Sequence, residues 1–186
     1  MMLMSGILCI KAPAQNLTVK TNLLDDASLN VNLGGEVRLA SKWSAEVPVS
    51  LNFWNVDGHK WKHWHVSPGV RYWLCEAFAG HFLGIHAIGT QYNIGNIDIP
   101  VNLLGTDFRK LKDNRYEGWG IGAGISYGYS WILGRHWNLE AELGVGYVWS
   151  RYSRFECQGC GRKVESGKNH HYVGPTRLAV NLVYVF

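Results

Sequence analysis

Residues 137–149 read WNLEAELGVGYVW, and they alternate between two kinds of side chain. The odd-numbered positions are apolar or aromatic throughout: Trp137, Leu139, Ala141, Leu143, Val145, Tyr147 and Trp149. Most even-numbered positions are polar or glycine, namely Asn138, Glu140, Glu142, Gly144 and Gly146. A period of two places successive side chains on opposite faces of a β-strand. The stretch therefore predicts a strand with one apolar face and one polar face.

The same alternation recurs along the whole chain, and no stretch shows a convincing helical period. Eight segments carry it: 16–24, 30–40, 43–54, 63–74, 81–93, 116–132, 136–151 and 172–186. The connections alternate between short turns, such as 41–42, 75–80 and 133–136, and loops that are mostly long. Short turns at one end and long loops at the other are typical of bacterial outer-membrane proteins. The predicted fold class is all-β, an eight-stranded antiparallel up-and-down transmembrane β-barrel.

The tryptophans support a membrane barrel over a soluble one. Within a strand, paired tryptophans are 9 to 12 residues apart, which spans about 23–30 Å and matches an apolar band of ~25 Å. Indoles collect at membrane interfaces, so two girdles are predicted. One holds Trp43, Trp73, Trp131 and Trp137 at the periplasmic end, and the other holds Trp54, Trp61, Trp64, Trp119 and Trp149. A soluble barrel such as a lipocalin would need its apolar residues inside.

Both ends of the chain carry features of an exported protein. Residues 1–14 are largely apolar and contain Ala12 and Ala14 in an Ala-x-Ala pattern, so a signal peptide is predicted there, although a basic n-region is missing. Residues 15–186 then form one barrel domain in the outer membrane of a Gram-negative bacterium. Tyr184 and Phe186 lie on the apolar face of the last segment. This terminal aromatic pattern predicts an assembly signal for the barrel-assembly machinery.

The polar faces of the predicted strands carry eight charges. They are four cations and four anions: Lys20, Glu36, Arg38, Glu46, Arg71, Glu140, Glu142 and Arg177. The interior of an eight-stranded barrel is just wide enough for side chains to fill it, and charges buried there must be paired. The neutral sum therefore predicts a closed polar interior. A narrow ion path through the same residues is the alternative.

Four blocks of sequence carry a resemblance to a known family. They are VKTNLL (19–24), KWKHWHVSPGVRYWLCEAFAGHFLGIH (60–86), RYEGWGIGAGISYGYSWILGRHWNLEAELGVGYVW (115–149) and GPTRLAVNLVYVF (174–186). They resemble an uncharacterised family of small outer-membrane barrel proteins from anaerobic Gram-negative bacteria, a domain of unknown function. The resemblance implies the fold and the location, but no catalytic residues. In size and architecture the chain is also similar to OmpA/OmpX-type barrels.

A cysteine motif lies in the predicted outer loop 152–171. Cys157 and Cys160 form Cys-x-x-Cys, and His170 and His171 follow. Three interpretations stay open: a disulfide, a structural zinc that also uses one of the histidines, or free thiols. Each interpretation predicts a structural role, so no catalytic cofactor is expected.

The outer loops also carry cations beside aromatic residues, which suits anionic lipopolysaccharide, and Arg115 and Arg151 are the predicted contacts. The overall charge of +4 is spread along the chain and does not suggest nucleic-acid binding. No serine or aspartate has a recognisable spacing to the histidine cluster 59–65. We therefore expect a monomeric, non-enzymatic barrel that lies in the outer-membrane lipid. Its expected role is structural, or it binds a surface-protein partner that the sequence does not identify. The alternatives are a barrel enzyme acting on lipids and a narrow channel.

Overall fold

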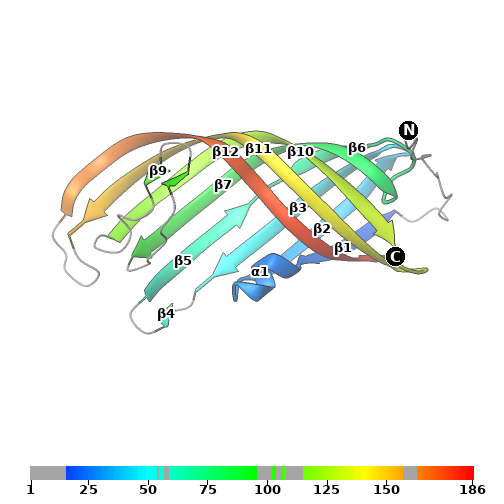
Figure 1. Ribbon diagram of the computed structural model, residues 1–186, viewed down its shortest axis with the longest axis horizontal. Coiled ribbons are helices and arrows are strands. Elements are labelled where there is room, and N and C mark those ends of the chain that lie inside the picture. Colours follow the sequence, from blue (N-terminus) through cyan, green and yellow to red (C-terminus); the bar gives the residue numbers. More distant parts are fainter. Residues whose placement is uncertain are drawn as a thin grey trace, which may run out of the picture.

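A computed structural model shows a closed antiparallel β-barrel with one short helix (Figure 1). It describes residues 16–53, 55–56, 59–95, 102–103, 106–107, 115–156 and 163–186. The barrel wall consists of β1 (Leu17–Asn22), β2 (Val31–Ala40), β3 (Trp43–Asn52), β5 (His59–Val66), β6 (Gly69–Trp73), β7 (Gly80–Gly95), β10 (Arg115–Ile132), β11 (Trp137–Phe155) and β12 (Lys163–Val185). The short elements are α1 (Leu23–Ala27), β4 (Asn55–Val56), β8 (Asn102–Leu103) and β9 (Thr106–Asp107).

The eight predicted segments correspond to eight barrel strands. Neighbours in sequence pair antiparallel around the wall, and β1 closes it by pairing with both β2 and β12. The fourth barrel strand is divided into β5 and β6 at Ser67 and Pro68. Proline has no N–H to give to a sheet, and the Ser67 N–H bonds instead to the carbonyl of Pro48 at 3.1 Å. The prediction of an all-β, eight-stranded antiparallel barrel is confirmed.

The two faces of the wall differ as the alternation predicts. Outward residues such as Ile85, Ile125 and Leu178 are 62–69% exposed. Inward residues such as Glu140 and Asn138 are almost fully buried. The barrel wall is therefore apolar outside and largely polar inside. Within the described residues no helix is both long and apolar enough to span a membrane.

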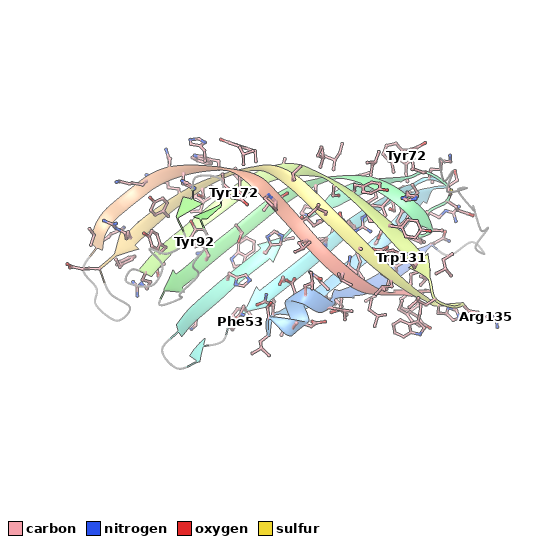
Figure 2. All side chains as sticks on the ribbon, viewed as in Figure 1. Phe53, Tyr72, Tyr92, Trp131, Arg135 and Tyr172 are labelled. Carbon is pink, nitrogen blue, oxygen red and sulfur yellow. The ribbon has the colours of Figure 1, made fainter. Side chains whose placement is uncertain are left out.

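One end of the barrel holds the short turns, the start of β1 and the C-terminal Phe186 (Figure 1). Trp43, Trp131 and Trp137 are 45–47% exposed on the outer surface at this end, where Figure 2 labels Trp131. Three of the predicted long-loop tryptophans, Trp64, Trp119 and Trp149, lie on outward positions at the opposite end. Trp54 lies outside the described residues, and nothing is described of the Trp61 side chain.

Trp73 corrects the predicted girdle, because its side chain lies inside the barrel and is 0% exposed. Its ring packs against Phe78 and Phe82, with ring centroids 6.0 and 4.7 Å away. Phe78 belongs to the turn after β6, which folds into the barrel end with a positive φ of 72° at that residue. An apolar plug results, made of Trp73, Ala77, Phe78, Phe82, Val183 and Val185.

Cys75 lies in the same turn and is disulfide-bonded. The chain has four cysteines, and the other three are outside the described residues.

The β11–β12 hairpin is longer than the sequence predicts. The predicted loop 152–171 is largely strand, since β11 continues to Phe155 and β12 begins at Lys163. Side-chain contacts support this extension: Tyr116 packs on Tyr152 at 5.6 Å, and the Arg115 guanidinium lies 4.2 Å from the centre of the Phe155 ring. β11 and β12 therefore project furthest at the long-loop end (Figure 1).

The first long-loop connection contains α1, where the sequence predicts only a short link. Asn22 caps the helix, because its side chain accepts a hydrogen bond from the Leu24 N–H at 3.2 Å. Asp25 and Asp26 occupy the first turn, where the helix dipole favours acids. Strand β1 ends at this cap and is only six residues long, against twenty-three for β12.

Candidate functional site

A network of buried charges crosses the barrel interior, and Arg71 is at its centre. Arg71 comes from β6 and contacts all four inward carboxylates. Its Nη1 lies 3.1 Å from carboxylate oxygens of both Glu36 and Glu140. Its Nη2 lies 2.9 Å from Glu46 and 2.5 Å from Glu142. One guanidinium thus links β2, β3 and β11 across the lumen.

Lys20 joins the network from the short strand β1. Its Nζ lies 2.8 Å from Glu36 and 3.7 Å from Glu140, and it also bonds Glu46. Gly34 of β2 is its cross-strand partner, and a Cβ on Gly34 would come within 3.0 Å of the Lys20 side chain. The glycine therefore leaves the space in which the long lysine chain reaches the carboxylates.

Arg177 joins the network from β12. Its Nη1 donates to Glu142 at 3.0 Å and also to Glu46. Its Nη2 donates to the backbone carbonyl and the hydroxyl of Ser67, at 2.9 and 2.7 Å. The break between β5 and β6 thus supplies two acceptors to the network.

Arg38 is the one predicted interior charge that lies elsewhere. It pairs with Glu76 of the turn after β6 at 3.0 Å, and both side chains are partly exposed. The central network consequently holds three cations and four carboxylates, where the sequence predicted a balanced set of four and four. The sequence analysis missed Glu76 because it lies in a turn, outside the strand alternation.

The network and the plug lie next to each other in the barrel interior. The seven networked side chains are at most 9% exposed. Below them, the plug residue Phe82 presents its ring to Arg71, whose guanidinium carbon is 4.2 Å from the ring centre. Buried charges in such a network are costly to leave without partners. The ion pairs therefore keep these seven charged side chains in place across the lumen.

A cavity of about 410 Å³ adjoins the network. Arg71, Glu142 and Arg177 border it, together with neutral polar side chains such as Ser50, His65 and Thr90. Within the described residues, no side chain of β10 borders it. The cavity therefore lies beside the part of the wall formed by β12, β1, β2, β3, β5 and β7.

His86 is a buried interior residue that the sequence analysis did not single out. It is 2% exposed, and its Nε2 lies 3.1 Å from the hydroxyl of Thr176 on β12. Its position between Gly84 and Ile88 on the inward face of β7 follows the same period of two. The alternation was thus the signal that could have identified it.

The residues of the predicted cysteine site are only partly described. Cys157 and Cys160 lie outside the described residues. His170 and His171 are consecutive on β12, where they pair with Ser150 and Trp149, and successive strand residues point to opposite faces. The two histidines therefore do not converge on one point. Within the described part of the chain, no group of three or more His, Cys, Asp or Glu side chains is placed to hold a metal ion.

The remaining predicted residues occupy the two ends of the barrel. At the long-loop end, Arg151 is exposed on β11, and Arg115 stacks on Phe155. At the short-turn end, Tyr184 packs against Phe186 at 4.9 Å and against Trp137 at 5.1 Å. The terminal aromatic pair thus belongs to the cluster of exposed rings around that end.

Comparison with known proteins identifies a family but no activity. The family described as "Protein of unknown function (DUF3575)" matches residues 1–186, so the chain belongs to that family. No curated protein and no solved structure matches the chain.

Proposed function

We propose that this family member is an integral outer-membrane β-barrel of a Gram-negative cell. Its interior is closed, and it acts without catalysis, by presenting its long-loop end in a structural or surface-interaction role. The observation that carries the proposal is the apolar outer face of the wall. Its exposed residues include Val37, Val47, Leu83, Ile85, Ile121, Ile125, Leu143, Val145, Val173 and Leu178.

The pattern of exposure suits lipid and does not suit water. Soluble monomers rarely expose contiguous apolar patches larger than a few hundred Å², and here apolar residues alternate with buried polar ones around the wall. Aromatic rings border this band at the short-turn end, where Tyr129 packs on Trp131 and Tyr184 on Trp137. Amphipathic rings of this kind are favoured at a membrane interface.

The interior supports the closed form of the proposal over the channel alternative. A conducting path would have to pass both the plug and the charge network. Arg71 alone connects carboxylates from three strands, so the lumen is crossed by paired side chains at this level. In planar bilayers we expect no stable conductance steps from the unmodified protein, and reproducible single-channel openings would contradict the closed interior.

Partners follow from the same placement. The exposed side chain of Arg151 on β11 and the side chain of Arg115 on the adjacent strand β10 suit the phosphates of lipopolysaccharide. The Tyr184–Phe186 end suits the barrel-assembly machinery. Residues 1–14 would be removed on export, and the mature barrel would be a monomer. A structural zinc at Cys157 and Cys160 stays a prediction, alongside a disulfide or free thiols.

The decisive experiment measures insertion. Purified protein refolded with lipid vesicles should float with them and migrate differently on gels before and after heating. Ile125→Lys places a charge in the middle of the proposed apolar band and should destabilise the inserted barrel by about 2–4 kcal/mol. The matched control is Trp119→Lys on the same strand, β10, near the rim of the proposed apolar band, where the cost falls to about 0–1 kcal/mol. A folded protein that stays in the aqueous fraction would contradict the proposal.

A further inference from the structure

The barrel wall is incomplete along one seam. β12 runs from Lys163 to Val185, but β1 pairs with it only from Asn181 to Val185. Toward the long-loop end, β12 has no strand on that side within the described residues. The chain forms α1 at the place where a longer β1 would have continued. The seam is therefore flanked by a helix and a strand edge, without a continuous hydrogen-bond ladder.

Side chains hold this seam. Asn22 accepts a hydrogen bond from the Val180 N–H at 3.1 Å and donates one to the Leu178 carbonyl at 3.4 Å. On the other side of α1, Asp26 accepts hydrogen bonds from Thr21 at 2.8 Å and from Asn32 at 2.7 Å. A few individual hydrogen bonds stabilise a contact less than a continuous ladder of backbone hydrogen bonds does. The seam can consequently open at far lower cost than a paired section of the wall.

The interior cavity lies against this seam. Asn22, Asp25 and Asn32 border it from one side, and Thr176, Leu178 and Ala179 border it from the other. Leu178 is 65% exposed on the outer face and yet borders the cavity. Along the seam, α1 and the edge of β12 lie between the cavity and the surroundings of the barrel.

The cavity also contains a polar group that lacks a partner. Ser50 is 7% exposed and faces inward from β3, and its hydroxyl has no hydrogen-bond partner within the described structure. Buried hydroxyls normally find a partner, so an unsatisfied one facing a cavity of about 410 Å³ points to a polar ligand. This volume is within the range of small-molecule sites, about 300–1,000 Å³.

The charges at the site select the ligand. The three cations that border the cavity are already held by carboxylates. Arg71 contacts four of them, Lys20 contacts three, and Arg177 contacts two. Because the network has more carboxylates than cations, it disfavours a further anion. The remaining polar groups of the lining, including Ser50, Thr90 and Asn32, suit an uncharged, hydroxyl-bearing group.

The rim of the seam is apolar. Leu23 and Leu24 of α1 are 40% and 39% exposed, Leu29 is 69% exposed, and Val173 on β12 is 64% exposed. We propose that the cavity binds the uncharged, hydroxyl-bearing head group of a single-chain membrane lipid. The lipid enters between α1 and β12, and its acyl chain lies along the apolar rim. This inference rests on the membrane location proposed above.

A photoreactive monoacylglycerol in lipid nanodiscs tests the inference on the unmodified protein. Adducts should concentrate on segments 22–34 and 173–181, and unlabelled monoacylglycerol should compete with them. Lysophosphatidic acid has the same single chain but an anionic head group, and it should compete about tenfold less well, a difference of about 1.4 kcal/mol. Labelling spread evenly over the outer face, or equal competition by the anionic lipid, would overturn the inference.

Variants then locate the site. Ser50→Phe fills the cavity and should reduce labelling by about tenfold or more, whereas Val145→Phe, on the lipid-facing side of β11, should not. Asp26→Ala loosens α1 without removing a residue that borders the cavity, and it should speed labelling. An unchanged rate would contradict entry through the seam. If Ser50→Phe does not fold, the competition experiment still decides the matter.

Insertion is verified for every sample by its heat-dependent migration on gels before labelling begins. A protein that fails to insert contradicts the proposed function, and an inserted protein that is labelled evenly contradicts only the lipid site.

Discussion

Replacing Arg71 with methionine is the most direct test of the charge network. The substitution keeps most of the side-chain volume but removes the one cation that contacts Glu36, Glu46, Glu140 and Glu142 together. Four buried carboxylates would then face only two cations, Lys20 and Arg177. Removing one partner of a buried ion pair costs about 3–5 kcal/mol. We expect at least this loss, because Arg71 is 1% exposed and contacts four acids.

Arg38→Met is the matched control. Arg38 also faces inward, but its pair with Glu76 is partly exposed and separate from the network, so its loss should cost about 0–1 kcal/mol. Urea unfolding of vesicle-inserted protein, followed by tryptophan fluorescence, would measure both variants. Equal losses in the two variants would refute the idea that the network stabilises the barrel.

A second substitution separates charge from packing. Adding Glu142→Gln to Arg71→Met removes one negative charge from a network that has too few cations, and it keeps the shape of the side chain. If the excess negative charge causes the loss, the double variant should be more stable than Arg71→Met alone. If the lost guanidinium packing on Phe82 is the cause, the second change should give no recovery.

Three further predictions concern the ends of the barrel. Phe186→Ala should lower the yield of heat-modifiable barrel in the outer membrane and increase periplasmic degradation; an unchanged yield would contradict the assembly signal. Charge reversal of Arg115 and Arg151 to Glu should weaken lipopolysaccharide retention in mild detergent, whereas reversal of Arg135, in the short turn 133–136 at the opposite end (Figure 2), should not. One zinc per chain that is lost in Cys157→Ser would support a metal site, and two thiols detected only after reduction would support a disulfide; two free thiols beside a well-ordered loop would exclude both.

The period of two was sufficient to predict the barrel wall, because an apolar outer face and a polar inner face impose it on every strand. It places Glu140 and Glu142 inward and Leu143 and Val145 outward, as the structure does. The same period also places Trp73 beside Arg71 on the inward face. The prediction that Trp73 belongs to an outer girdle ignored this alternation, and it was wrong.

Other features depend on contacts that no local pattern records. Strand extension past the barrel rim relies on cross-strand pairs such as Tyr116–Tyr152, whose sequence neighbours are polar and do not alternate clearly. α1 is five residues long, which is too short for a helical period, and its signals were the cap Asn22 and the acids that follow it. The cavity borders the early end of β1 at Asn22, and this becomes visible only when the partner strand β12 is placed beside β1.

The short β1 and the charge network have a common explanation. A six-residue strand forms few backbone hydrogen bonds with its neighbours, so it needs other attachment to the wall. Lys20 supplies this attachment, since its ammonium group reaches Glu36 on β2, Glu46 on β3 and Glu140 on β11. The first strand is thereby fixed across the lumen as well as along its edges. This attachment allows β1 to end at Asn22, and the early end of β1 leaves the seam through which we propose that lipid reaches the cavity.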